Sequence, residues 1–196
     1  MNEAAHAGRR TARGVRGKAL TAATELINKV GMESLSIRTI AARAGIGTSS
    51  MYHHFPNKEE LLLQIALGGF QNLTNDMAQI RRGGDPALGP FARGARVFLD
   101  KVAGNAPLYH LMFNEHLMAR HENLREAERQ AFAAFQECVA EDDRFPVEIA
   151  ESLALTMWTL GRGMAASAAS RPDGQLTVEF RAEIGRATAW LIDRRL

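Results

Sequence analysis

The sequence predicts an all-α protein of about nine helices, with a small amino-terminal domain followed by a larger helical bundle. Two observations lead to this fold class. Apolar residues recur at the three- and four-residue spacing of amphipathic helices along most of the chain, and the alternating pattern of strands is almost absent. Glycine and proline clusters interrupt that periodicity. With 196 residues, 46% of them hydrophobic, the chain is long enough for a small domain plus a larger one.

The first 82 residues predict four helices after a short arm. Residues 1–17 are polar and basic and are expected to form a flexible arm. Leu20, Ala23, Ile27 and Val30 repeat at helical spacing and stop at Gly31, a suitable C-cap. Two short helices are predicted within residues 36–55, and a long helix over 57–82 then ends at the break at 83–86. These elements divide the chain into an arm (1–17), a domain at 18–60 and a second domain at 61–196, with helix 57–82 bridging the two.

Five more helices complete the predicted fold. Apolar faces mark four helices. The first ends near residue 104, the second begins at Pro107, and the other two span about 124–138 and 147–169. After a turn at 171–174, residues 176–180 have the composition of a strand. The spacing of Phe180, Ile184, Ala187 and Leu191 nevertheless favours a final helix.

Charge is distributed unevenly along the chain. Residues 1–58 hold nine Lys or Arg against three acids, whereas the remaining 138 residues are net negative. A basic first third suggests contact with a polyanion, although a solvated basic tail fits the same charges. The single cysteine, Cys138, excludes an intrachain disulfide and a cysteine-based zinc site. Because neither a membrane-spanning stretch nor a signal peptide is evident, we expect a cytoplasmic protein.

Residues 34–58 have the pattern of two short helices joined by a tight turn. Ser36 can cap a two-turn helix whose inward positions are Ile37, Ile40 and Ala41. Gly45 supplies the left-handed backbone that such a turn requires. A second helix over about 48–54 directs Met51 and Phe55 inward. Its outer face would carry small or hydrogen-bonding side chains, which suit a helix lying in the major groove of DNA: Thr48, Ser49, Tyr52 and His53.

This segment resembles the tetracycline-repressor family of regulators. The match runs from Ile37-Arg38 through Ala44-Gly45-Ile46 and resumes from Met51-Tyr52 to Leu61-Leu62, fixing some fifteen positions. The resemblance implies a helix-turn-helix that binds double-stranded DNA. It assigns base-edge contacts to Thr48, Ser49 and His53, phosphate contacts to Tyr52, His54 and Lys58, and a backbone contact to Arg38.

The segment departs from the family pattern at two positions. Gly47 stands where the family often has a capping Ser or Thr, and Ser49 stands where Gly is frequent. Glycine in place of a capping residue costs only a few tenths of a kcal/mol of helix stability, so the assignment to the family holds. Because of the two departures, the family pattern does not predict the operator sequence. Upstream, Arg9, Arg10, Arg13 and Arg16 could reach phosphates or the minor groove, and a solvated tail is an equal alternative.

The second half resembles the subgroup of that family named for a Trp-x-x-x-His-Gly signature. Trp158 and Gly163 match, but Arg162 stands where the histidine is expected. In this family the last two helices imply a homodimer contact. Gly161, Gly163 and several alanines would allow close helix approach here, although packing within one subunit would use the same residues.

A small-molecule effector is expected to bind between the fourth and eighth helices. Soft and aromatic side chains suit an apolar ligand, although such a set is often plain core. The candidate ligand-binding residues are Phe91, Phe98, Met112, Phe113, Met118, Phe132, Phe135 and Trp158, with His110, His116 or Arg162 as polar anchors. Binding would release a near-palindromic operator by moving the bridging helix, which makes the chain a repressor.

Other function classes fit less well. The histidines lack the spacing of a helical metal pair, and neither a phosphate loop nor a nucleophile motif is present, so we expect no enzyme, no metal and no cofactor. A ligand-responsive activator or a corepressor-dependent regulator would use the same DNA contacts and remains an alternative. The position of the operator relative to the promoter would separate these.

Overall fold

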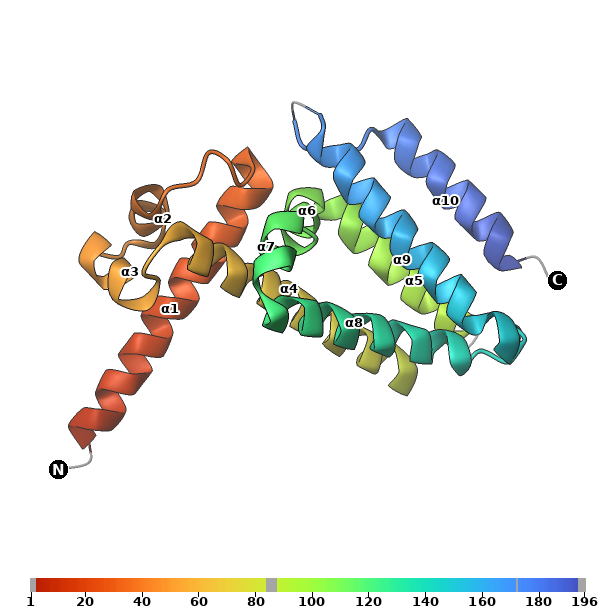
Figure 1. Ribbon diagram of the computed structural model, residues 1–196, viewed down its shortest axis with the longest axis horizontal. Helices are drawn as coiled ribbons and strands as arrows, with labels where there is room; N and C mark the ends of the chain where they lie inside the picture. The colour runs from red at the N-terminus through yellow and green to blue at the C-terminus, as the bar shows by residue number, and fades with distance from the viewer. Residues whose placement is uncertain (1–2, 84–87, 172, 194–196) are drawn as a thin grey trace.

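The computed structural model describes residues 3–83, 88–171 and 173–193. Within these ranges the chain forms ten α-helices and no strand, which confirms the all-α fold class. The helices form two parts. A three-helix domain lies at the amino end, and a larger bundle carries the carboxyl end at the opposite side of the molecule (Figure 1).

The three-helix domain consists of α1 (Glu3–Val30), α2 (Ile37–Ala44) and α3 (Thr48–His54). Of the stripe predicted for α1, Ala23 and Ile27 are fully buried, whereas Leu20 is half-buried and Val30 is 49% exposed. Ala19, one residue before Leu20, is fully buried instead. α1 ends at Gly31, whose φ of 74° is the left-handed conformation predicted for this C-cap.

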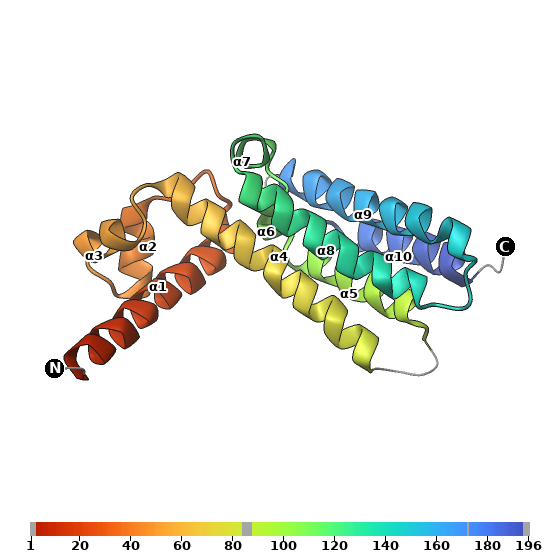
Figure 2. The ribbon, with the colours of Figure 1, turned by 60° about the horizontal axis from the view of Figure 1, so that its bottom comes forward.

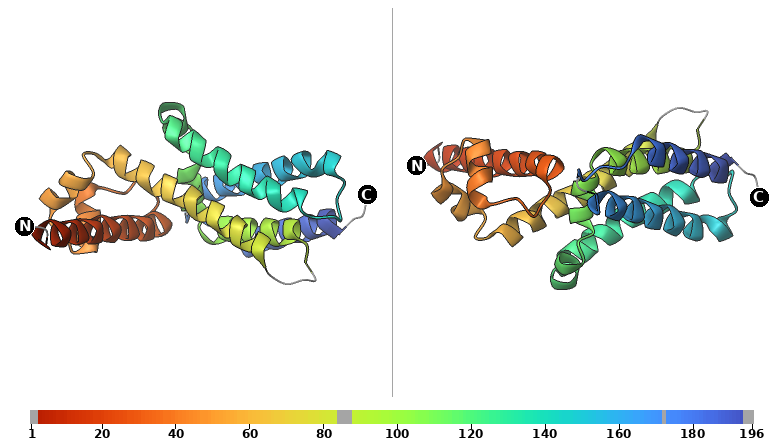
Figure 3. Two further views of the ribbon diagram at one scale, coloured as in Figure 1. Left: turned by 90° about the horizontal axis from the view of Figure 1, so that it is seen from below. Right: turned by 90° about the horizontal axis from the view of Figure 1, so that it is seen from above.

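α4 (Lys58–Arg82) belongs to both parts. It leaves the three-helix domain and runs beneath α8 (Glu122–Ala140) along the bundle, as Figure 2 shows. The rest of the bundle consists of α5 (Pro90–Gly104), α6 (Ala106–Met112), α7 (Glu115–Arg120), α9 (Val147–Ala169) and α10 (Val178–Asp193). Views from below and above show α4 as the main connection between the two parts (Figure 3).

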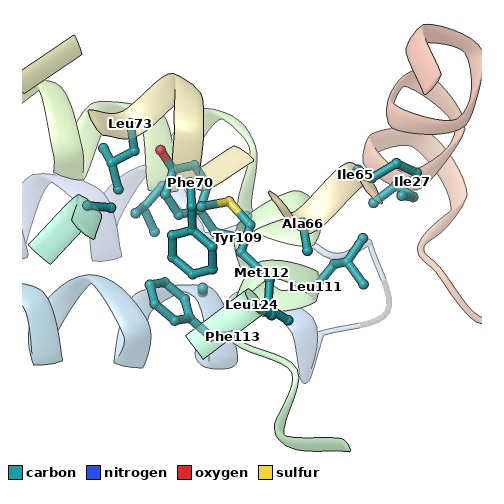
Figure 4. Packing of buried hydrophobic residues seen from close by; sticks show 14 of the residues in the cluster. Ile27, Ile65, Ala66, Phe70, Leu73, Tyr109, Leu111, Met112, Phe113 and Leu124 are labelled. Carbon is teal, nitrogen blue, oxygen red and sulfur yellow. The ribbon is translucent and has the colours of Figure 1, made fainter. Parts of the chain in front are cut away.

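A continuous hydrophobic core runs from the three-helix domain into the bundle. Phe70 and Leu73 of α4 pack against Tyr109 and Met112 of α6, and Phe70 meets Phe113 edge to face at 5.4 Å (Figure 4). Ile27 of α1 and Ile65 of α4 extend the same cluster toward the amino end. Because the core is shared, a displacement of α4 in the bundle would be felt in the three-helix domain.

The structure differs from the expected elements in two places. Residues 3–17, expected as a flexible arm, continue α1 as helix, because their alanines and arginines are strong helix formers. The side chains of Arg9, Arg10 and Arg13 lie outside the described residues, as does that of Leu191. The short α7 is an additional element, for which Asn114 provides the N-cap by accepting a hydrogen bond from the Leu117 amide.

No helix in the described part of the chain combines the length and the apolarity that a membrane span requires.

Candidate nucleic-acid interface and effector region

The α2–turn–α3 unit has the local geometry that its sequence predicted. The Ser36 side chain accepts from the Thr39 amide at 3.1 Å, while the Thr39 hydroxyl accepts from the Ser36 amide, so the two residues form a capping box. Gly45 ends α2 in the left-handed region with φ of 64°. The Ile46 amide then donates to the Ala41 carbonyl at 2.9 Å, which closes the turn before α3.

α3 is held by its inner face and leaves its outer face to solvent. Met51 and Phe55 are fully buried, as predicted from their four-residue spacing. Thr48, Ser49 and His53 are exposed, and Tyr52 is 51% exposed despite its large ring. An exposed tyrosine beside hydroxyl and imidazole groups, on a helix fixed by a buried core, offers hydrogen-bonding groups to an external partner.

The remaining predicted DNA contacts surround α3. Arg38 is exposed on α2, and His54 is half-buried at the end of α3. Lys58 is the first residue of α4, and Asn57 caps this helix by accepting a hydrogen bond from the Glu60 amide at 2.8 Å. Nζ of Lys58 is 3.4 Å from the Glu33 carbonyl oxygen. Lys58 thus lies beside Glu33 and the α6–α7 segment, whereas the exposed predicted contacts belong to α2 and α3.

Two other basic residues of this domain have internal partners. Arg43 of α2 pairs with Glu25 of α1 at 2.7 Å, which joins the two helices. Arg16 donates to Gln64 of α4 and lies over the Phe55 ring at 5.9 Å. Arg16, which sequence reasoning grouped with the arginines of the arm, thus contacts α3 and α4 of its own domain.

Most of the predicted ligand-binding residues form a packed aromatic core. Phe98 stacks on Trp158 at 5.0 Å with an interplanar angle of 10°, and Phe135 contacts both rings. Phe91, Phe98, Met112 and Phe135 are at most 1% exposed. Phe132 is half-buried and meets Trp158 edge to face at 5.4 Å, and Met118 packs as a partly buried residue.

Phe113 and Arg162 lie at the edge of this core, in the wall of a groove. The groove has a volume of about 690 Å³ and lies between the α6–α7 segment and α9. The Arg162 guanidinium lies 5.0 Å from the centre of the Phe113 ring, and its Nη1 donates to Glu128 at 3.3 Å. Glu128 also accepts from the Trp158 indole at 3.4 Å. His110 and His116, the other predicted polar anchors, line the same groove.

An ion-pair cluster connects α7 to the first turn of α4. Arg120 donates to Glu59 at 3.0 Å, and Nε2 of His121 is 2.9 Å from the same carboxylate. The His121 hydrogen bond and the positive charge of Arg120 hold the pKa of Glu59 below its usual range. Nε2 of His116 lies 3.1 Å from Arg120. The cluster therefore extends from His116 in the groove to Glu59, the residue that follows Lys58.

Sequence reasoning missed Glu59, Arg120, His121 and Glu128. Glu59 and Arg120 are 61 residues apart, and Glu128 is 34 residues from Arg162. Each reads as an ordinary charged residue on a helix surface, so no local signal marks it. Only the packing of α7 and α8 against their neighbours brings these side chains together.

The outer surface of α9 and α10 exposes several large apolar side chains. Leu155 of α9 is 56% exposed, and Val178 and Trp190 of α10 are 67% and 54% exposed. Gly185 and Ala187 of α10 are exposed too and would allow close approach of another helix, whereas the exposed Gly163 and Ala166 of α9 belong to the groove described above. Phe180 and Ile184 pack partly against the core.

Sequence comparisons identify the amino-terminal domain. Residues 19–65 match the family described as bacterial regulatory proteins, tetR family. The chain is 35% identical over 82 residues to the HTH-type transcriptional repressor DrrR1 of Streptomyces coeruleorubidus, a match covering 39% of this chain and 30% of the relative. It is 48% identical over 44 residues to the tetracycline repressor protein class C of Escherichia coli, covering 22% and 20% of the two chains. The chain thus matches less than a third of the length of these relatives.

Solved structures extend the likeness to the whole fold. A protein of unknown function from Rhodococcus sp. RHA1 aligns with a TM-score of 0.66 and 23% identity over 90% of this chain and 94% of that chain. A TetR transcriptional regulator from Legionella pneumophila aligns with a TM-score of 0.61 and 21% identity over 87% and 95%. The matched family segment ends at residue 65, before Trp158 and Gly163, so the subgroup assignment stays a prediction.

Proposed function

From an amino-terminal domain that belongs to the tetR family of bacterial regulatory proteins, we propose that this chain is a sequence-specific DNA-binding transcriptional repressor of the cytoplasm. The observation that carries the proposal is the outer face of α3. Thr48, Ser49, Tyr52 and His53 are exposed together on a helix that a capped α2 and a buried Phe55 hold in place. Such a helix enters the major groove, where side chains of this kind meet base edges.

The residues divide by the part of DNA they would contact. Thr48, Ser49 and His53 are the proposed base readers. Tyr52, His54 and Lys58, together with Arg38 on α2, are the proposed backbone contacts, which position the domain without reading sequence. This division follows from the family resemblance and is supported by the exposure of the outer face.

We place the homodimer contact on α9 and α10. The exposed Leu155, Val178 and Trp190, with small residues between them, form an apolar surface that a second copy would cover. A two-fold dimer places two α3 helices about 34–36 Å apart, one turn of B-DNA, and so reads a near-palindrome.

Operator release by a small effector completes the proposal. A ligand bound in the bundle would favour a position of α4 in which the two α3 helices no longer fit successive grooves. A typical coupling of ~1–3 kcal/mol weakens operator binding ~5–150-fold, provided that the ligand prefers the released state. The shared core along α4 supports this route. A ligand-responsive activator would use the same contacts.

Selection of binding sites from a random DNA pool tests the proposal directly. A near-palindromic consensus with half-sites one helical turn apart is the expected result. Binding of all sequences with equal affinity and a steep salt dependence would contradict sequence-specific recognition.

A further inference from the structure

The groove between the α6–α7 segment and α9 combines an apolar wall with nitrogen-bearing side chains. Its volume of about 690 Å³ lies within the usual range for small-molecule sites. Ala165 and Ala166 of α9 and the edge of Phe113 line it, and Gly163 adds no side chain. A β-carbon at Gly163 would meet no atom within 4 Å, so the groove is open at that point.

Two side chains of the groove have unused hydrogen-bond donors. Nη1 of Arg162 donates a hydrogen bond to Glu128, while its Nε and Nη2 have no hydrogen-bond partner among the described residues. The guanidinium lies over the Phe113 ring, and this contact limits the side-chain entropy that binding would remove. The imidazole of His110 is half-buried and has neither a hydrogen bond nor an ion pair within the described part of the chain.

We propose that this groove is a binding site for a small organic carboxylate, with the carboxylate on Arg162 and His110 and the apolar body along Phe113 and the α9 alanines. The planar fork of arginine matches the geometry of a carboxylate, and charge-assisted hydrogen bonds are about twice as strong as neutral ones. One acid, Glu115, also lines the groove and opposes an anion there. Replacement of Glu115 by Gln is therefore expected to tighten carboxylate binding.

The groove is connected to the DNA-binding end through His116. This histidine lines the groove and contacts Arg120, which pairs with Glu59 in the first turn of α4. An anion that draws His116 toward itself weakens its contact with Arg120. This consequence rests on the proposed function, whereas binding in the groove does not.

The test is a calorimetric titration of the full-length protein with 2-naphthoate and, separately, with the neutral 2-naphthamide. These probes share their shape and differ in charge. We expect saturable 1:1 binding of 2-naphthoate, about tenfold tighter than of the amide. Arg162→Gln is expected to abolish this preference, and Arg96→Gln, an exposed arginine of α5 outside the groove, is expected to retain it.

A second variant tests the location. Gly163→Leu fills the open part of the groove and is expected to weaken 2-naphthoate binding at least tenfold without lowering the melting temperature. Equal affinity for the two probes, or unchanged binding by Gly163→Leu, would overturn the proposal. If Gly163→Leu changed the sedimentation of the protein but not its affinity for 2-naphthoate, the proposal would also be overturned, because a second copy of the chain would then occupy the groove.

Operator binding provides a separate readout. Glu59→Gln is expected to leave 2-naphthoate affinity unchanged and to reduce the effect of 2-naphthoate on DNA affinity. Failure of all DNA binding, with the charge preference intact, would count against the regulator and in favour of the groove.

Discussion

Tyr52 and His53 are neighbours on the exposed face of α3, and we assign them different partners on DNA. Tyr52→Phe removes a phosphate hydrogen bond and should weaken binding about equally on all sequences. His53→Ala should instead relax preference at particular base pairs, by ~1–3 kcal/mol at each position it reads. Binding measured on the selected consensus and on its single-base variants separates these effects. A uniform loss for His53→Ala would contradict its role as a base reader.

Gly161 and Gly163 are two residues apart on α9 and provide a matched pair. A β-carbon at Gly161 would overlap the Phe98 ring, which Trp158 and Phe135 hold in place. Gly161→Ala should therefore lower the free energy of unfolding by ~1–3 kcal/mol. Gly163→Ala meets open space and should raise it by ~0.5–1 kcal/mol, because alanine favours helix. Urea denaturation of both variants checks this, and equal effects would mean that Phe98 can move.

At the scale of elements, Asp142 joins the start of α5 to the turn between α8 and α9. Its carboxylate is 1% exposed, accepts from the Phe91 amide at 3.0 Å, and pairs with Arg144 at 2.7 Å. Burial by itself raises the pKa of Asp142, but the bonds from Arg144 and the Phe91 amide outweigh it and lower the pKa.

The ionised form of Asp142 therefore stabilises the fold. Because its pKa is lower in the folded than in the unfolded chain, this contribution is complete above the ordinary value of about 3.9 and is lost as pH falls through the folded pKa. Asp142→Asn should cost ~1–3 kcal/mol at pH 7 and flatten the acid limb of stability. Denaturation midpoints at pH 7 and at pH 3 measure both. A variant as stable as the natural chain at pH 7 would show that the pair contributes nothing.

At the scale of the whole molecule, the proposed dimer depends on α10. Trp190→Glu places a charge on a surface that a second copy would cover and should shift the protein from dimer to monomer in sedimentation equilibrium. Val30→Glu, a change at a 49%-exposed residue of α1, is the control and should leave the dimer intact. A monomeric natural chain, or a dimeric Trp190→Glu variant, would move the contact elsewhere.

The sequence by itself determined the local elements. Ser36 and Gly45 act through bonds to residues at most a few positions away, so the cap of α2 and the turn before α3 followed from nearest-neighbour chemistry. The buried faces of Met51 and Phe55 followed from helical period alone. The family resemblance added roles for these residues because its motif is equally local.

Only the tertiary structure decided which of the candidate ligand residues are core and which line a groove. Phe98 and Phe113 are the same residue type, each among apolar residues. Phe98 nevertheless stacks on Trp158 inside the core, whereas Phe113 borders an open groove with Arg162. The Glu59–Arg120 and Glu128–Arg162 contacts were equally hidden. Pairs of this kind join residues far apart in sequence, and their energy depends on distances that helix packing sets, so no local pattern records them.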